Sequence, residues 1–251
     1  MLRSLAFASI VSIVFSKDPA QGWLGYAKGT SPTSGTTPIT YIEATWTNLK
    51  NPVDDGCFYS PWFGIETSDN LNLFQPVNPW NGRNEWTIYN EYFQWSPEHN
   101  ENSKSHIVYP GDKIYGNVTF NQARQEYTAY HADLTPGHEW SVTTTIPVQK
   151  DSRGNYKVYT ITYFVFEKVC SRCSQYPPDD VVTFSDIKVE WGGKQENPKW
   201  ETAYVDNVCN NRAKIVSPSE VQITWNSKSN EKPDLTHWER NKYPDSKKWH
   251  Q

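Results

Sequence analysis

Apolar and polar residues alternate with a period of two along much of this 251-residue chain. In Ile39–Thr47 (ITYIEATWT), for example, Ile42, Ala44 and Trp46 alternate with polar side chains, as on a strand with one buried face. The same pattern predicts further strands over residues 85–95, 113–121, 127–132, 139–146, 156–169, 180–191 and 221–225. No stretch shows a sustained 3.6-residue apolar stripe, so the pattern does not predict a helix.

Clusters of turn-forming residues separate these strands. They are residues 51–56 (NPVDDG), 81–84 (NGRN), 109–112 (YPGD), 135–137 (TPG) and 151–155 (DSRGN). Many strands at this spacing, without helices between them, predict an all-β fold in which two antiparallel sheets form a sandwich. We find no internal repeat and no linker, and we expect one β-sandwich domain over residues 17–225.

The two ends of the chain differ from this pattern. Residues 1–16 carry one charge, Arg3, followed by an apolar run from Leu5 to Phe15. That run is too short to span a bilayer, which takes ~20 apolar residues, and it predicts a cleaved secretory signal peptide. Residues 226–251 are lysine-rich, polar and aperiodic, which predicts a flexible tail. We therefore expect a secreted, extracellular protein without a membrane partner.

Charge and composition narrow the functions further. The formal net charge is −4, and no basic block lies outside the mixed-charge tail, so we expect no nucleic-acid partner. The chain has 12 Trp, 15 Tyr and 10 Phe but a single Met. This composition is typical of strands and of aromatic binding surfaces rather than of helix bundles.

The four cysteines, Cys57, Cys170, Cys173 and Cys209, suit an oxidising compartment and allow three complete disulfide pairings. Cys170 and Cys173 have the CxxC spacing of half a zinc site, but no second pair accompanies them, so we favour disulfides. Asn117-Val-Thr119 is a sequon and predicts a glycosylated Asn117.

The common hydrolase motifs are absent from the sequence. It has no Gly-x-Ser-x-Gly element and no phosphate-binding glycine loop. The six histidines are scattered without metal-ligand spacing, so we expect no metal and no cofactor.

Polar residues inside aromatic strands remain as candidates. Gln75 ends the apolar run of Leu71, Leu73 and Phe74 and closes this segment, because Pro76 follows at once and a Gln-Pro step does not pair easily in a sheet. Alternation over residues 156–169 places Tyr159, Ile161, Tyr163, Val165 and Glu167 on one face, opposite Phe164, Phe166 and Lys168. Glu167 would line an aromatic groove if this face is concave; otherwise it is a solvated carboxylate at a strand end.

An ordered series of short motifs resembles the glutamic peptidases, or eqolisins, over roughly residues 20–190. These motifs are Trp23-Leu-Gly-Tyr26, Glu43-Ala-Thr-Trp-Thr47, Ser60-Pro-Trp-Phe-Gly-Ile65, Leu73-Phe-Gln75, Tyr92-Phe-Gln-Trp-Ser-Pro97, Pro110-Gly-Asp112 and Val182-Thr-Phe-Ser-Asp186. The resemblance implies a concanavalin A-like β-sandwich of two antiparallel sheets. It also implies hydrolysis of peptides at acidic pH by a Gln and a Glu on the concave face.

The resemblance aligns Gln75 with the catalytic glutamine. Glutamate can take a proton from the attacking water, and a glutamine amide can donate to the oxyanion without titrating. The family motif resembles Glu-Trp-Ile-Val-Glu, and one alignment places Tyr163 on the catalytic glutamate and Glu167 on the second. Sliding the alignment places Glu167 on the catalytic position, and alternation alone leaves both open. Glu139-Trp140 imitates the motif but falls at the wrong distance from its neighbours.

We therefore expect an endopeptidase with Gln75 and Glu167 as catalytic residues. Trp62, Tyr92, Gln94 and Tyr163 are expected to bind a polypeptide substrate, with the protein acting as a monomer. Gln94, Asn90 and Pro79 stand where the family often has carboxylates, so fewer like charges should leave a nearby glutamate's pKa close to its ordinary value. The alternative is a catalytically inactive sandwich that binds peptide or glycan in the aromatic groove.

Overall fold

The computed structural model describes residues 22–82, 84–167, 170–204 and 208–230. The regular elements of these residues are strands, apart from one short 3-10 helix at Cys173–Gln175, so the predicted all-β class is confirmed. The predicted signal peptide and residues 231–251 of the predicted tail lie outside the described residues. Within the described ranges, no helix has the length and apolar character needed to cross a membrane.

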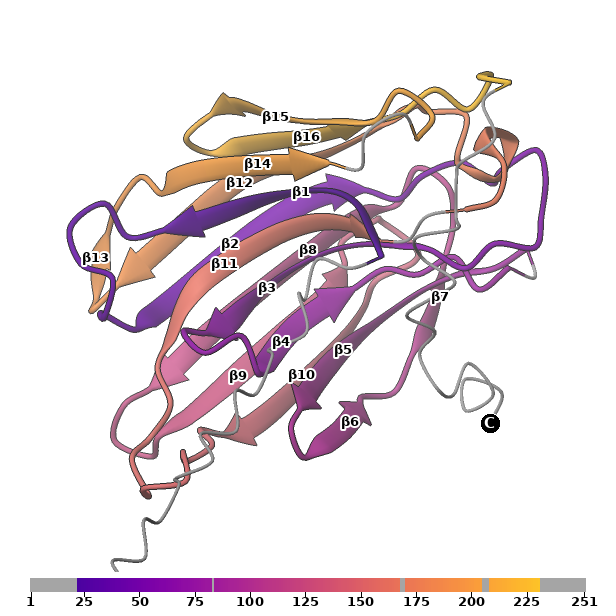
Figure 1. Ribbon diagram of the computed structural model, residues 1–251. Helices are drawn as coiled ribbons and strands as arrows, with labels where there is room; N and C mark the ends of the chain where they lie inside the picture. Colours follow the sequence, from indigo (N-terminus) through magenta and orange to yellow (C-terminus); the bar gives the residue numbers. More distant parts are fainter. Residues whose placement is uncertain (1–21, 83, 168–169, 205–207, 231–251) are drawn as a thin grey trace, which may run out of the picture.

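Eight strands form the first sheet, in the order β14-β1-β11-β3-β4-β5-β6, with β7 also paired to β5. Their bounds are β1 Trp23–Thr30, β3 Ser60–Thr67, β4 Asn72–Val77, β5 Trp86–Trp95, β6 Glu98–Asn102, β7 His106–Val108, β11 Tyr159–Glu167 and β14 Lys199–Tyr204. The strand neighbours pair antiparallel throughout this sheet. Figure 1 shows the first sheet nearer to the viewer.

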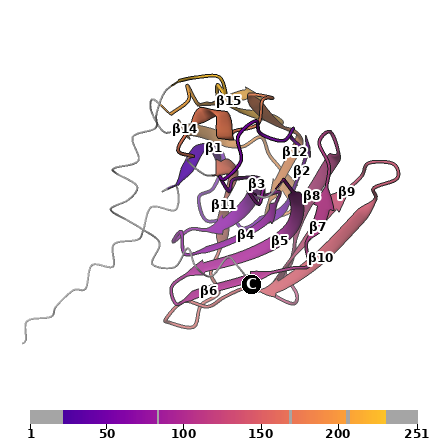
Figure 2. The same ribbon diagram turned by 90° about the vertical axis from the view of Figure 1, so that its right-hand side faces the viewer.

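Eight further strands form the second sheet, in the order β10-β9-β8-β2-β12-β16-β15, with β13 paired to β12. Their bounds are β2 Ile39–Thr47, β8 Lys113–Asn121, β9 Glu126–Asp133, β10 Trp140–Pro147, β12 Val181–Trp191, β13 Lys194–Gln195, β15 Arg212–Ser217 and β16 Glu220–Thr224. Figure 2 shows the two sheets stacked as the layers of a sandwich.

The core between the sheets is built on aromatic side chains. The ring of Phe164 in β11 lies 5.4 Å from that of Phe63 in β3 and 5.3 Å from that of Phe184 in β12, measured between centroids. Such contacts add to the free energy of burying the apolar area. They explain why the described chain contains so many aromatic residues and needs so few leucines.

A second apolar cluster covers the other face of the first sheet, which we call the outer face. Its buried members are Trp23, Trp62, Leu73, Val77, Ile161, Tyr163 and Val165. Because both faces of the central strands β3 and β4 are covered, every residue of these two strands is buried. Polar side chains on the outer face of these strands are thus held largely out of water.

Two sequence predictions in this sheet were wrong. Tyr159 packs in the core between the sheets rather than on the outer face, because a bulge between Tyr159 and Ile161 shifts the alternation of β11. Strand β4 does not end at Gln75 but continues through Pro76 to Val77. The pairing of β3 with β4 runs from Trp62–Val77 to Glu66–Leu73, and it is broken between Trp62–Val77 and Ile65–Phe74, where Gln75 and Pro76 lie.

Two disulfides join the segments at one end of the sandwich, as the sequence predicts. Cys57 pairs with Cys170, and Cys173 pairs with Cys209, which selects one of the three possible pairings. The CxxC spacing is therefore not half a zinc site, because each cysteine bonds to a different partner. Disulfides of this kind are typical of proteins in oxidising compartments.

Candidate active site

Gln75 lies at the centre of the outer face, in the middle of the first sheet. Its side chain is 3% exposed, and its amide Nε2 donates a hydrogen bond of 2.7 Å to Oε2 of Glu91. Its Oε1 accepts no hydrogen bond from the described residues. Because the amide nitrogen carries two hydrogens, one donor position remains for a further acceptor.

Gly64 brings strand β3 unusually close to Gln75. A Cβ atom at Gly64 would lie 2.7 Å from the carbonyl oxygen of Phe74 and 2.8 Å from Cβ of Gln75. These separations are far inside van der Waals contact, so a residue with a side chain would push the strands or Gln75 aside. Glycine is thus required where the Gln75 side chain leaves its strand.

Tyr163, not Glu167, lies across Gly64 from Gln75. The register pairs Tyr163 of β11 with Gly64 of β3, whereas Glu167 is paired with Ser60, four residues further along β3. Tyr163 is buried, and its ring contacts the rings of Trp23 and Tyr26 edge-on. In the row of side chains that crosses the sheet at Gln75, the residue on β11 is therefore Tyr163. The first alignment to the peptidase motif also has Tyr163, and not a glutamate, at the catalytic position.

Glu167 is half-buried at the end of β11 and is held in place by a tryptophan. The indole Nε1 of Trp62 donates a 2.9 Å hydrogen bond to Oε2 of Glu167. The charge of Glu167 also acts on Glu91 and on Tyr89, where it raises the pKa of each group. Glu167, which lies four residues along β3 from the row of Gln75, is thus joined to Trp62 of the outer face, and its charge reaches Glu91.

Glu91 is a site residue that the sequence analysis did not single out. It is paired with Gln75 in the register of β4 and β5, and its side chain is 7% exposed. Burial is the main cause that raises its pKa to about 7; hydrogen bonds from Asn100 and Gln75 oppose this rise, and the charge of Glu167 adds to it. A carboxyl group with this pKa can hold or release a proton near neutral pH.

Glu66 is a second buried carboxyl group on the outer face. It is fully buried, and burial raises its pKa to about 8, although hydrogen bonds from Asn70 and Tyr163 act in the opposite direction. The expectation that glutamates near Gln75 keep ordinary pKa values is thus wrong for Glu66 and Glu91. Burial under the aromatic cover, which sequence comparison does not show, outweighs the loss of neighbouring carboxylates.

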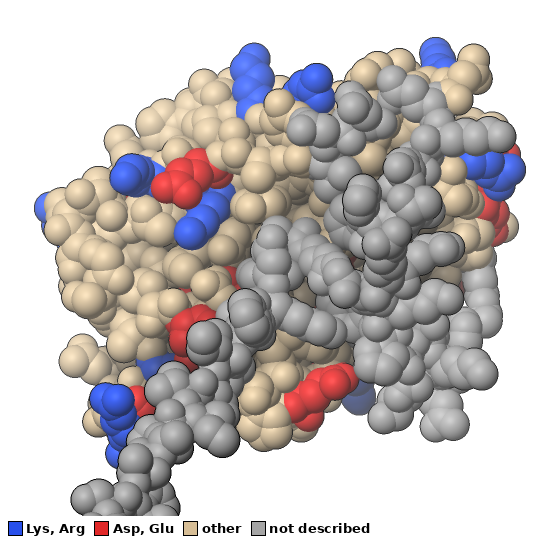
Figure 3. Space-filling view, in the orientation of Figure 1, with Lys and Arg blue, Asp and Glu red and all other residues tan. Residues whose placement is uncertain are grey.

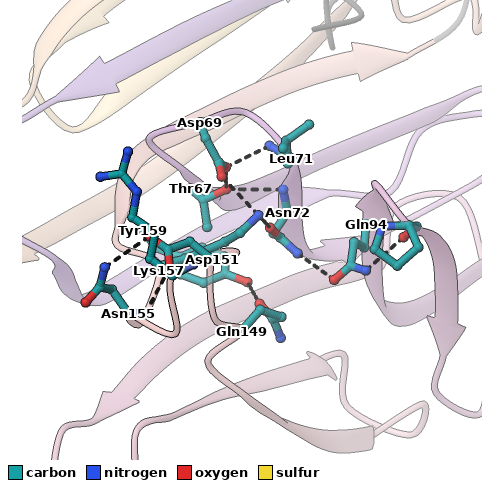
Figure 4. A network of polar contacts seen from close by, with 12 residues as sticks. Thr67, Asp69, Leu71, Asn72, Gln94, Gln149, Asp151, Asn155, Lys157 and Tyr159 are labelled. Atoms are coloured by element: carbon teal, nitrogen blue, oxygen red, sulfur yellow. Dashed lines mark hydrogen bonds and ion pairs between the residues drawn. The ribbon is translucent and has the colours of Figure 1, made fainter. Parts of the chain in front are cut away.

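Tyr92 and Gln94 point away from Gln75, contrary to the prediction that they bind substrate beside it. Tyr92 packs in the core between the sheets, and its hydroxyl donates to Oε1 of Gln94. The amide of Asn72 donates to the same oxygen, and Lys157 continues this network, which Figure 4 shows. Alternation along β5 sends Tyr92 inward and its neighbour Glu91 outward, so the two predicted residues have a structural role.

Of the remaining predicted site residues, Trp62 lies on the outer face and Asn117 does not. Trp62 is fully buried there among Trp23 and other rings. Asn117 lies in β8 of the second sheet, where its Nδ2 donates to the hydroxyl of Tyr115. Its glycosylation stays a prediction.

Three potential metal ligands meet at the other sheet, although the sequence shows no ligand spacing. Asp112, Asp133 and His138 bring one ligand atom each to within 4.8 Å of one another. Nδ1 of His138 lies 2.9 Å from Oδ1 of Asp112, and the interaction between the two carboxyl groups helps to lower the pKa of Asp112 and to raise the pKa of Asp133. The pair of His138 and Asp112 accounts for two of these three groups.

Comparisons with solved structures agree with this architecture. Scytalido-glutamic peptidase, in a complex with a transition-state analog inhibitor, matches with a TM-score of 0.60 and 17% identity, over 82% of this chain and 98% of that chain. SCP-B, an eqolisin family peptidase in a complex with the tripeptide Ala-Ile-His, matches with a TM-score of 0.58 and 17% identity over the same shares.

No protein-family model matches the chain, and no curated protein matches it. At 17% identity the structural likeness shows the fold and leaves the chemistry to the residues themselves. The chain is a β-sandwich of the kind found in the glutamic peptidases, with a glutamine and three glutamates on the outer face of one sheet.

Proposed function

We propose that this protein is a secreted glutamic-type endopeptidase that hydrolyses polypeptides on the outer face of the first sheet. Gln75 would donate a hydrogen bond to the oxyanion, and Glu167 would be the general base that activates water. Trp62 and Tyr163 would line the substrate site. The observation that carries the proposal is the buried Gln75 amide, held by Glu91 within a region that the charge of Glu167 also reaches.

The first chemical step follows from these groups. The carboxylate of Glu167 takes a proton from water while the water oxygen attacks the carbonyl carbon of the scissile peptide bond. The electrons of the carbonyl double bond move to its oxygen, which accepts a hydrogen bond from Nε2 of Gln75. Glutamine suits this task because its amide remains a neutral donor at every pH.

The surroundings of the site favour an uncharged substrate backbone. Figure 3 views the molecule in the orientation of Figure 1, and on the described surface of this side basic and acidic side chains lie beside one another rather than in a patch of one sign. Next to Gln75, the outer face consists of aromatic rings, amides and buried carboxyl groups rather than of cations. A peptide chain offers the backbone donors and acceptors that such a surface can use.

The proposal is tested by cleavage of an unfolded protein between pH 3 and pH 7 in the presence of pepstatin. Gln75→Ala and Glu167→Gln should each lower kcat/KM by about a hundredfold or more, because each removes a group that acts in the transition state. Gln222→Ala and Glu201→Gln, on other strands, serve as matched controls and should retain activity.

The outcomes separate the candidate roles. Activity lost only in Gln75→Ala would remove Glu167 from the mechanism while retaining the enzyme. A folded protein without activity at any pH in this range would refute the proposed function and favour the alternative of a peptide- or glycan-binding sandwich.

A further inference from the structure

Glu91 lies beside Gln75 but has no role in the attack of water described above. The leaving nitrogen and the oxyanion of a tetrahedral intermediate are bonded to the same carbon atom. A group that accepts the other hydrogen of the oxyanion donor can therefore reach the leaving nitrogen when this nitrogen lies on its side of the carbon. Oε2 of Glu91 lies 2.7 Å from Nε2 of Gln75, and Asn100 fixes its other oxygen with a second amide hydrogen bond of 2.7 Å.

The charge of Glu91 also bears on catalysis. A carboxylate in contact with the Gln75 amide would occupy one of its hydrogens and would repel an oxyanion bound to the other. The oxyanion is therefore stabilised best when Glu91 is protonated. The structure provides for this, because Glu91 is nearly buried and forms no ion pair with any described residue.

The groups around Glu91 are few. From β4 and β6 the neutral amides of Gln75 and Asn100 contact it, and from β11 the charge of Glu167 acts on it. On the same strand as Glu91, the titratable group is the hydroxyl of Tyr89, whose pKa is raised by burial and by the charge of Glu91. Burial and the charge of Glu167 raise the pKa of Glu91 to about 7, so the group is protonated at acidic pH.

We propose that Glu91 is a further catalytic residue, the general acid that protonates the leaving amine, while Glu167 is the general base. This inference rests on the proposed peptidase function. Glu91 and Glu167 differ in the way that such a pair requires, because one is nearly buried and the other is half-buried and accepts an indole N–H. Two carboxyl groups in different environments can divide the acid and base roles.

The second chemical step releases the amine. After water has added and its proton has moved to Glu167, the carboxylic O–H of Glu91 gives its proton to the peptide nitrogen. The C–N bond breaks, its electron pair stays on the nitrogen, and the oxyanion closes to a carboxylic acid. Glu91 is left ionised and Glu167 protonated, and a proton passing from Glu167 to Glu91 through solvent restores the site.

Two substrates with the same acyl group test this role: a peptide, whose amine leaves only when protonated, and a p-nitrophenyl ester, whose phenolate leaves without a proton. Glu91→Gln should lower kcat/KM for the peptide at least a hundredfold but for the ester by less than tenfold. Glu167→Gln, the matched change at the base, should lower both. Cleavage of the ester also shows that Glu91→Gln is folded.

The pH dependence of peptide cleavage provides a second test, which uses a different variant. Peptide cleavage by the wild-type protein should fall as the pH rises through about 7, as Glu91 loses its proton. The hydrogen bond from Asn100 lowers the pKa of Glu91, so Asn100→Ala on the exposed strand β6 should move this fall to higher pH. This readout does not require a change at Glu91 itself.

Each outcome decides between the proposals. Equal losses for peptide and ester in Glu91→Gln, full peptide activity in that variant, or an unmoved pH limb in Asn100→Ala would overturn the acid role. The peptidase function itself would survive those results. Failure of the wild-type protein to cleave either substrate would instead overturn the proposed function.

Discussion

At the scale of single residues, Gln75 shows why a neutral amide can occupy the centre of a buried face. A lysine or arginine in its place would have to be desolvated, which costs several kcal/mol unless a partner compensates. The amide instead donates to Glu91 and keeps a second hydrogen available. A residue that must donate at every pH in a dry site is therefore better a glutamine than a cation.

Glu66 shows the opposite case, in which a titratable group is kept neutral by burial. Its pKa of about 8 in the folded protein exceeds the ordinary value of 4.5, so the folded state holds a proton that the unfolded state releases. The contribution of Glu66 to stability is therefore fully present below pH 4.5 and is lost as the pH rises to about 8.

Glu66→Gln should remove this pH dependence, because an amide of the same shape does not ionise. We expect the loss of unfolding free energy between pH 4 and pH 8 to be smaller in the variant than in the wild type, by on the order of 3 kcal/mol. Urea unfolding at the two pH values measures the difference. Glu98→Gln on exposed β6 is the control, and equal losses in wild type and Glu66→Gln would contradict the assignment.

At the scale of elements, the contact between β3 and β4 positions the candidate site. Pro76 has no backbone N–H, and it lies at the break in the β3–β4 pairing, where its missing donor costs least. On the inner side of this contact, Cγ of Pro76 would lie 3.0 Å from a Cβ atom at Gly116 in β8. The Gln-Pro step thus turns glutamine outward while proline fills the space between the sheets.

Gly64→Ala should therefore lower the activity by more than its loss of stability explains. Its new Cβ atom would meet Cβ of Gln75 and the Phe74 carbonyl at less than 3 Å, and overpacking of this kind typically costs about 1–3 kcal/mol. We expect kcat/KM to fall at least tenfold at a temperature where the variant is folded. Gly35→Ala is the control, because nothing lies within 4 Å of its Cβ position. Unchanged kinetics in Gly64→Ala would show that Gln75 needs no precise placement.

At the scale of the whole molecule, buried titratable groups act in opposite directions on stability. Burial lowers the pKa of His131 from 6.5 to about 3, because the charged imidazole would lose its water. The contribution of His131 to stability is present above pH 6.5 and is lost as the pH falls toward 3. Glu66 and Glu91 have raised pKa values and lose their contributions as the pH rises above 4.5.

Between pH 4.5 and 6.5 the two glutamates outweigh the single histidine, whereas below pH 4.5 the histidine dominates these three groups. We therefore predict that the melting temperature is highest near pH 4.5 and declines toward pH 8. Calorimetry from pH 3 to pH 8 measures this profile. A melting temperature that rises continuously up to pH 8 would contradict the burial of these groups.

Local patterns in the sequence were sufficient for the fold class and for several elements. Strands at Ile39–Thr47 and Lys113–Asn121 begin and end at the predicted residues, because strict alternation is a property of one strand and its two faces. For the same reason, Ile161, Tyr163 and Val165 lie together on the outer face, opposite Phe164 and Phe166. The short strands β6, β7 and β13 carried too few residues to show a period.

The site depended on contacts that no local pattern contains. Alternation along β5 separates Glu91 from Tyr92, but only the register with β4 places Glu91 beside Gln75. A bulge moved Tyr159 to the opposite face, and burial is the largest cause of the raised pKa values of Glu66 and Glu91. The sandwich and its aromatic faces follow from alternation, which is a local property of each strand. The partners of Gln75 follow from strand register and burial, which join residues far apart in the chain.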